Sequence, residues 1–197
     1  MRAMRKRTQF WIAAAIFLGP FIAAVVIYRW FPQWLPEGRT NYGRMIDPPR
    51  PLPNLTLANP QGEPVDPWKG HWTLVYVAPA VCEDACRERT HFGRQLWLAM
   101  NEKRVKLKRV YIAPDVDSIV QARDALAADN PDAVWLGGTG TAGYDVRLFF
   151  EIADPEALYL VDPFGNWLMT YPQSPGPEGL QRDFKGMQKD LNKLLKL

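Results

Sequence analysis

Residues 74–87, LVYVAPAVCEDACR, carry the features from which the fold of this chain can be predicted. An apolar run ends in a short loop, and the loop leads to Cys82 and Cys86, which are the only two cysteines in the sequence. Open α/β sheets place their reactive groups at the carboxyl ends of buried strands. We therefore expect a buried strand before the loop, a helix after it, and the functional site between them.

The sequence around this stretch alternates strands and helices. Residues 72–77 predict a core strand, a helix is expected over about 84–102, and residues 106–113 predict a second strand. A strand, helix and strand of these lengths form a right-handed βαβ unit. Apolar residues at helical spacing then predict a further helix through residue 128, with Asp117 as its N-cap.

Two hairpins and a terminal helix are expected outside this unit. Residues 52–66, LPNLTLANPQGEPVD, predict an N-terminal hairpin. Residues 157–161 and 167–171 flank an Asp-Pro-Phe-Gly turn and predict a second antiparallel hairpin. From about Pro177 the sequence predicts an amphipathic helix that packs on the sheet. Its apolar face would consist of Leu180, Phe184, Met187, Leu191, Leu194 and Leu195.

The glycine-rich stretch 135–144, WLGGTGTAGY, is expected to be a loop. It lacks the strand, turn and helix context that a phosphate-binding fingerprint requires, which argues against a nucleotide site. The order hairpin, βαβ, helix, hairpin and helix then matches an α/β thioredoxin-like fold with an N-terminal hairpin over residues 52–197.

Residues 10–28, FWIAAAIFLGPFIAAVVIY, form an apolar run of about 19 uncharged positions that predicts a single transmembrane helix. Helices in lipid tolerate a proline such as Pro20 when neighbouring groups satisfy the freed carbonyl. Residues 1–9 form a basic tail, so the positive-inside rule predicts a cytoplasmic N-terminus at a bacterial inner membrane and a periplasmic C-terminal domain. A cleaved signal peptide is the alternative, although its apolar core is usually about 7–15 residues long and Ala23-Ala24 is a poor cleavage site.

Residues 29–51 are rich in proline and predict an extended stalk that holds the domain a short way off the bilayer. The net charge of +3 is due to the tail, where Arg2, Arg5, Lys6 and Arg7 lie. Within the folded part, only the last helix is locally basic, and its cations are those of an ordinary solvated face. We expect no nucleic-acid partner.

Cys82 and Cys86 predict redox or metal chemistry. An exported domain meets an oxidising compartment, so the pair can form a disulfide, and a purely structural disulfide is one alternative. A bridge that closes a loop of about five residues removes little entropy from the unfolded chain and stabilises weakly. The N-terminus of the following helix would lower a thiol pKa, because its free amides and dipole favour the thiolate.

Three segments in this order resemble the SCO/SenC family: YVAPAVCEDAC, RVYIAPDVDS and ALYLVDPFG. The resemblance covers residues 52–197, and its most specific parts are the Cys-x-Asp-x-Cys spacing and the Tyr-Leu-Val-Asp-Pro-x-Gly turn. The resemblance implies a membrane-anchored thioredoxin-fold factor that delivers copper to cytochrome c oxidase. It also implies that Cys82 and Cys86 bind that copper.

The resemblance implies a third copper ligand that this sequence lacks. In the family, a histidine a few residues before the downstream strand binds copper together with both cysteines. Here Asp154 takes about that position, and no histidine follows His91. Two thiolates can still hold Cu(I), whereas Cu(II) prefers imidazole and harder ligands, so we expect Cu(I) rather than Cu(II) at Cys82 and Cys86.

Asp154 and Pro155 form a loop that is expected to face the cysteines. In thioredoxin-like proteins that use only thiol chemistry, a cis-proline loop faces the dithiol, so a cis bond before Pro155 would resemble a reductase. The alternative for Asp154 is a solvated loop carboxylate. His91, five residues after Cys86, and His71, before the core strand, are not expected to face the cysteines.

Three functional hypotheses follow. The first is an SCO-like factor that assists cytochrome c oxidase assembly, by thiol–disulfide exchange or by passing Cu(I) to the copper-bearing subunit. Cys82 would be the nucleophile, and Cys86 would resolve the mixed disulfide. The second is a general exported thiol:disulfide oxidoreductase that acts on other exported thiol proteins. The third is a non-catalytic adaptor with an inert disulfide.

Overall fold

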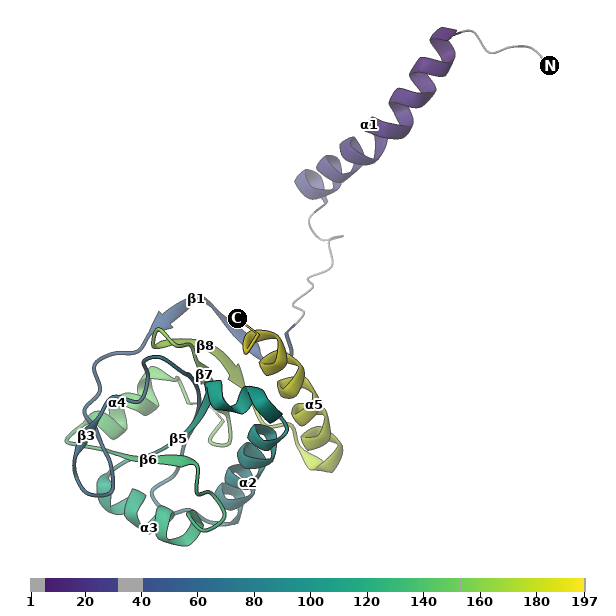
Figure 1. Ribbon diagram of the computed structural model, residues 1–197. Coiled ribbons are helices and arrows are strands. Elements are labelled where there is room, and N and C mark those ends of the chain that lie inside the picture. Colours follow the sequence, from purple (N-terminus) through teal and green to yellow (C-terminus); the bar gives the residue numbers. More distant parts are fainter. Residues whose placement is uncertain (1–5, 32–40, 153, 197) are drawn as a thin grey trace. The chain divides into compact units, whose positions relative to one another are not determined.

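The computed structural model describes residues 6–31, 41–152 and 154–196 (Figure 1). The chain divides into two compact units, Met1–Thr40 and Asn41–Leu197, and each is described by itself. The first part of the expected basic tail and the expected stalk at 32–40 lie outside the described residues.

The first unit contains one helix, α1 (Lys6–Trp30), among its described residues. Its segment Thr8–Trp30 has 23 residues, is long and apolar enough to cross a membrane, and is not buried inside the structure. The helix continues through Pro20. α1 thus contains the whole of the expected helix at 10–28 and is a candidate transmembrane span.

The second unit is built on an eight-stranded mixed sheet with strand order β1-β8-β7-β4-β5-β6-β2-β3. The parallel centre consists of β4, β5 and β6, and the hairpin of β7 and β8 adds antiparallel strands beside β4. The bounds are β1 (Arg44–Pro51), β2 (Leu57–Ala58), β3 (Pro64–Val65), β4 (Trp72–Val77), β5 (Leu107–Ala113), β6 (Ala133–Gly138), β7 (Leu158–Val161) and β8 (Asn166–Tyr171). Both expected hairpins are confirmed, because β2 pairs with β3 and β7 with β8.

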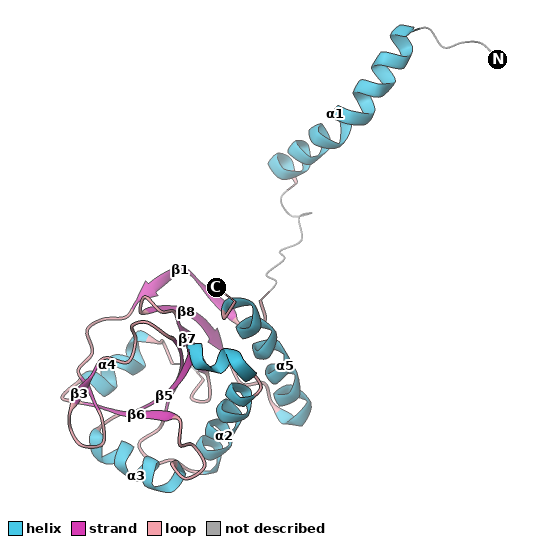
Figure 2. Cartoon of the chain, viewed as in Figure 1, coloured by secondary structure: helices cyan, strands magenta, loops and turns pink. Residues whose placement is uncertain are grey.

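Helices cover both faces of the sheet (Figure 2). One face packs against α2 (Asp84–Leu98), α3 (Val116–Leu126) and α5 (Gly176–Leu194), whose buried side chains share a core with alternate residues of β4 and β5. The other face packs against α4 (Ala142–Phe149) through Val146. A 3-10 helix, η2 (Asn101–Lys106), connects α2 to β5. The expected βαβ unit and terminal helix are therefore confirmed.

The expectation of a loop at 135–144 is wrong. Most of this stretch lies in β6 and in α4, and β6 pairs in parallel with β5. A Cβ atom on Gly137 would lie 2.6 Å from the backbone oxygen of Asp115. Glycine is therefore needed in β6 because the start of α3 passes close to the strand, and the glycines do not indicate a loop.

The N-cap of α3 is Asp115 and not Asp117. The Asp115 side chain accepts a hydrogen bond of 2.7 Å from the backbone N–H of Ser118, while Asp117 lies in the first turn. This bond holds the pKa of Asp115 below its ordinary value. Both carboxylates fit a helix N-terminus, and only the backbone geometry distinguishes the cap from the first turn.

The expected stalk at 29–51 overlaps the sheet. Arg44–Pro51 is strand β1, which pairs antiparallel with β8 at one edge and changes register between Met45 and Arg50. An edge strand tolerates prolines because one row of its backbone groups needs no partner. The folded unit therefore begins at Asn41 and not near Leu52.

Candidate functional site

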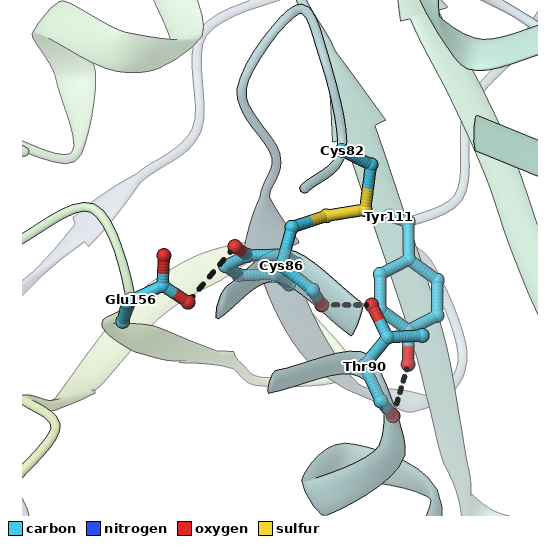
Figure 3. The surroundings of a disulfide bond; sticks show 6 residues. Cys82, Cys86, Thr90, Tyr111 and Glu156 are labelled. Carbon is cyan, nitrogen blue, oxygen red and sulfur yellow. Dashed lines mark hydrogen bonds between the residues drawn. A yellow bond between two sulfur atoms is a disulfide. The ribbon is translucent and has the colours of Figure 1, made fainter. Parts of the chain in front are cut away.

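Cys82 lies in the loop that follows β4, and Cys86 lies in the first turn of α2; the two are joined as a disulfide (Figure 3). All six residues of β4 are buried, and the backbone N–H of Ala78 still donates to Ile112 of β5 over 2.8 Å. The chain then leaves the sheet at its carboxyl edge. The two cysteines form a disulfide with their Cα atoms 5.2 Å apart.

The two sulfur-bearing residues differ in exposure. Cys82 precedes the helix and is half-buried, whereas Cys86 faces the core and is only 3% exposed. An incoming thiolate therefore reaches Cys82 more readily than Cys86. This is the arrangement that exchange through a mixed disulfide requires, with one accessible sulfur and one protected sulfur.

The N-terminus of α2 supports a thiolate at this place. Glu83 is the N-cap, and its side chain makes no capping hydrogen bond among the described residues. Cys86 lies in the first turn, where backbone N–H groups have no partner within the helix. Those amides and the helix dipole favour negative charge on a nearby sulfur.

A buried hydrogen-bond chain anchors the turn of α2 that carries Cys86 (Figure 3). The hydroxyl of Thr90 donates to the Cys86 carbonyl over 2.8 Å, and the hydroxyl of Tyr111 donates to the Thr90 carbonyl over 3.3 Å. Arg109 donates to the Tyr111 oxygen over 3.1 Å. Burial raises the pKa of Tyr111, so its hydroxyl stays protonated and remains a donor. These hydrogen bonds thus connect α2 to β5.

Glu156 is among the residues that surround the disulfide, and no sequence pattern indicated it (Figure 3). Its Oε2 accepts a hydrogen bond of 3.1 Å from the hydroxyl of Tyr76 in β4. Burial raises the pKa of Glu156, while the hydrogen bond from Tyr76 and the charge of Arg89 oppose the shift. Tyr76 and Glu156 are 80 positions apart, so only the folded sheet brings them together.

Asp154 ties its loop to the end of β8. Its Oδ1 accepts from the backbone N–H of Glu156 over 2.9 Å, and its Oδ2 accepts from that of Gln173 over 2.8 Å. The side chain is partly buried, so it is not simply a solvated carboxylate. Pro155 is exposed, and the cis peptide bond among the described residues is Asp47–Pro48 rather than Asp154–Pro155.

Arg89 is a buried cation on α2, three positions after Cys86, and sequence patterns did not indicate it. It is 1% exposed and donates through Nη2 to the carbonyl of Tyr171 over 3.2 Å. Burial lowers the pKa of Arg89, and the carboxylates of Asp183, Asp154 and Glu156 oppose that shift. The guanidinium thus links α2 electrostatically to α5 and to the loop before β7.

The residues near the cysteines do not form a three-donor metal site. Within residues 6–31, 41–152 and 154–196, no group of three His, Cys, Asp or Glu residues could hold a metal ion. His91 is exposed on α2, and His71 lies near the Lys69 carbonyl at the opposite end of β4. Two thiolates suit Cu(I), whereas Cu(II) needs imidazole or harder donors, so the donor set fits Cu(I) and does not fit Cu(II).

Solved structures of Sco proteins share this fold. ScoI of Bradyrhizobium japonicum with copper bound is 19% identical, covers 73% of this chain and 97% of its own, and has a TM-score of 0.52. Yeast Sco1 is 20% identical with a TM-score of 0.57, covering 72% of this chain and 92% of its own. BsSco is described with a disulfide switch and as a member of the Sco family of cytochrome c oxidase assembly proteins. It is 19% identical with a TM-score of 0.56, and the match covers 78% of this chain and 99% of its own.

At these identities the likeness shows the fold, and the expected resemblance to SCO/SenC proteins is confirmed at that level. No curated protein matches the sequence. A family described as "transmembrane-like, thioredoxin-like, C-terminal domain" matches residues 72–197, from β4 through α5. The chain therefore belongs to this transmembrane-like, thioredoxin-like family, with its cysteine pair at the start of the matched region.

Proposed function

We propose that this protein is a membrane-anchored thiol–disulfide exchange protein that assists the assembly of cytochrome c oxidase. One observation carries the proposal: the disulfide joins a half-buried Cys82 to a buried Cys86 at the N-terminus of α2. The helix N-terminus stabilises a departing thiolate, and the difference in exposure selects the sulfur that is attacked.

The exchange reaction runs through Cys82. A partner thiolate attacks the Cys82 sulfur, the bond to Cys86 breaks, and Cys86 leaves as a thiolate. A second thiolate of the partner then attacks the partner sulfur that is bonded to Cys82. This step forms a disulfide within the partner and releases Cys82 as a thiolate. The partner loses two electrons and the cysteine pair gains two. The opposite direction passes through the same mixed disulfide.

The proposed partner is the copper-bearing subunit of cytochrome c oxidase. The proposal takes its support from the Sco fold and from BsSco, which is described with a disulfide switch and as a member of an oxidase assembly family. The proposed topology has α1 spanning the bacterial inner membrane, the basic tail in the cytoplasm and the folded unit in the periplasm. A general exported oxidoreductase and an inert adaptor are the competing functions.

Trapping of mixed disulfides tests this function. The full-length Cys86→Ser variant keeps the accessible thiol and cannot resolve a mixed disulfide, so it should accumulate reducible adducts that include the copper-bearing subunit. Cys82→Ser is the matched control and should capture far less. Diverse adducts without that subunit would favour a general oxidoreductase, and a complete absence of adducts would favour the adaptor.

Transfer of Cu(I) is a second candidate function. The copper-bound Sco structures and the two adjacent thiols favour it, because two thiolates are a soft donor set. The reduced full-length chain, titrated with Cu(I) against a chromophoric chelator, should bind one ion per chain and lose that binding in Cys82→Ala. Failure of the reduced wild-type chain to compete with the chelator would reject this candidate.

A further inference from the structure

The exposed side of α5 is mainly basic. We define the basic face as Arg182, Lys185, Lys189, Lys193 and Lys196, all of which are exposed. At about 100° per residue, the four positions within α5 fall within an arc of about 80°, and Lys196 follows directly after the helix. Met187 and Leu191 lie on the opposite, buried side. A solvated helix face usually alternates the sign of its charges, whereas here the cations outnumber the single carboxylate, Glu178.

One acidic residue of α5, Glu178, falls within the same arc; it is exposed in the first turn, where a carboxylate is expected. Asp183 and Asp190 are 0% and 1% exposed, and both are bonded to backbone or hydroxyl donors inside the unit. Among the described residues, no ion pair joins Lys185 or Lys189 to a carboxylate. Their charges therefore remain available to a partner.

The basic face continues onto η2. Lys103 Nζ lies 2.8 Å from Oδ1 of Asn192 near the end of α5. This contact brings Arg104 and Lys106, both exposed, to the same end of the helix. The surface is thus extended by cations from a second element.

The chain enters the folded unit on α5. The backbone N–H groups of Tyr42 and Gly43 both donate to Asp190, over 2.7 and 2.9 Å, and the Tyr42 hydroxyl donates to Asp183 over 2.5 Å. Residues 31–40 precede this attachment and can extend over at most about 35 Å. A bilayer spanned by α1 is therefore always within reach of the point where the chain joins α5, which gives the surface a high effective concentration.

We propose that the basic face is a docking surface for the anionic lipid headgroups of the bilayer that holds α1. Clusters of four to eight Lys and Arg residues on an amphipathic helix attract anionic lipid, and salt screens that attraction. The proposal rests on the proposed membrane anchoring and not on the cysteine chemistry. It assigns a binding partner to a helix face for which the sequence alone predicted only contact with solvent.

Lysine footprinting of the full-length chain in lipid nanodiscs tests the proposal. The nanodiscs contain phosphatidylcholine alone or phosphatidylcholine mixed with phosphatidylglycerol, and a membrane-impermeant amine reagent reports lysine reactivity. Lys185 and Lys189 should react about fivefold more slowly with phosphatidylglycerol present, and high salt should remove the protection. Lys69, whose side chain is 83% exposed on another loop, should react equally in both lipids.

Charge reversal supplies the matched variants. Lys185→Glu combined with Lys189→Glu should abolish the protection of Lys193, whereas Lys69→Glu should leave it intact. Equal reactivity in both lipids, with the chain embedded, would overturn the proposal and leave the anchoring in place. If the lysines were protected in native membranes but not in anionic nanodiscs, the basic face would bind an acidic protein instead of lipid. That result would also overturn the proposal. A chain that does not co-elute with neutral nanodiscs would refute the anchoring and the proposal together.

Discussion

Cys82 and Cys86 are four positions apart and have different surroundings. Cys82 lies before the N-cap of α2, where the chain is still partly exposed, while Cys86 faces the core from the first turn. The backbone, and not the chemistry of the two identical side chains, therefore decides which sulfur is reached. In the proposed exchange reaction, Cys82 is therefore the attacked sulfur and Cys86 the leaving group.

Asp154 provides a test of structural role against metal binding. Asp154→Ala removes two hydrogen bonds to backbone N–H groups and should lower the free energy of unfolding by about 2 kcal/mol. Asp154→Asn keeps one oxygen acceptor and should cost about half as much. Urea unfolding of the full-length variants gives these values. If Asp154→Ala left stability unchanged and abolished Cu(I) binding, Asp154 would instead be a ligand.

At the scale of elements, α5 joins three parts of the folded unit. Its apolar side packs on the sheet, and its two buried carboxylates hold the entering chain at Tyr42 and the backbone N–H of Ser174. A Cβ atom on Gly186 would lie 2.1 Å from the Tyr42 ring, so this glycine allows the close approach. The entering segment is therefore an integral part of the fold.

Asp183 should make stability depend on pH. Burial alone would raise its pKa, but the hydrogen bonds from Ser174 and Tyr42 hold the pKa below its ordinary value. A carboxyl with a lowered folded-state pKa contributes stability above its unfolded pKa of about 3.9, and this contribution is lost as the pH falls through the folded value. Asp183→Asn should therefore destabilise the protein by about 1–2 kcal/mol at pH 7 and by less below about pH 4.

Urea unfolding at several pH values measures this difference. Asp124→Asn is the control, since Asp124 is exposed on α3. A destabilisation by Asp183→Asn that stays the same from neutral to acidic pH would contradict the assignment of charge to Asp183.

Several elements could be predicted from the sequence because their patterns are local. Apolar runs and turn residues located β4, β5, both hairpins and α5, and the cysteine spacing located the site. β6 was missed because Gly137 serves a close contact with α3, which no local pattern reveals. β1 was missed because prolines are acceptable only at an edge, and the sequence does not state where the edge is. Glu156 and Arg89 reach the site through contacts between distant strands and helices.

At the scale of the whole molecule, we propose that the apolar helix α1 is a retained membrane anchor. An uncleaved chain should keep its N-terminal residues in membranes and should resist extraction by alkaline carbonate, because the apolar run is long enough to span the bilayer. Intact mass spectrometry of the membrane-extracted protein measures this directly. A mature chain that begins after the apolar segment would show that it is a signal peptide.

The reduction potential of the Cys82–Cys86 pair distinguishes a working exchange pair from a structural disulfide. The full-length protein is equilibrated in thiol–disulfide redox buffers, and the fraction of reduced cysteine is read from the mass shift after alkylation. A working exchange pair with an accessible sulfur should titrate above about −300 mV and reach equilibrium quickly. A pair that stays oxidised well below that value, or does not react with small dithiols, would show that the disulfide is structural and has no role in exchange.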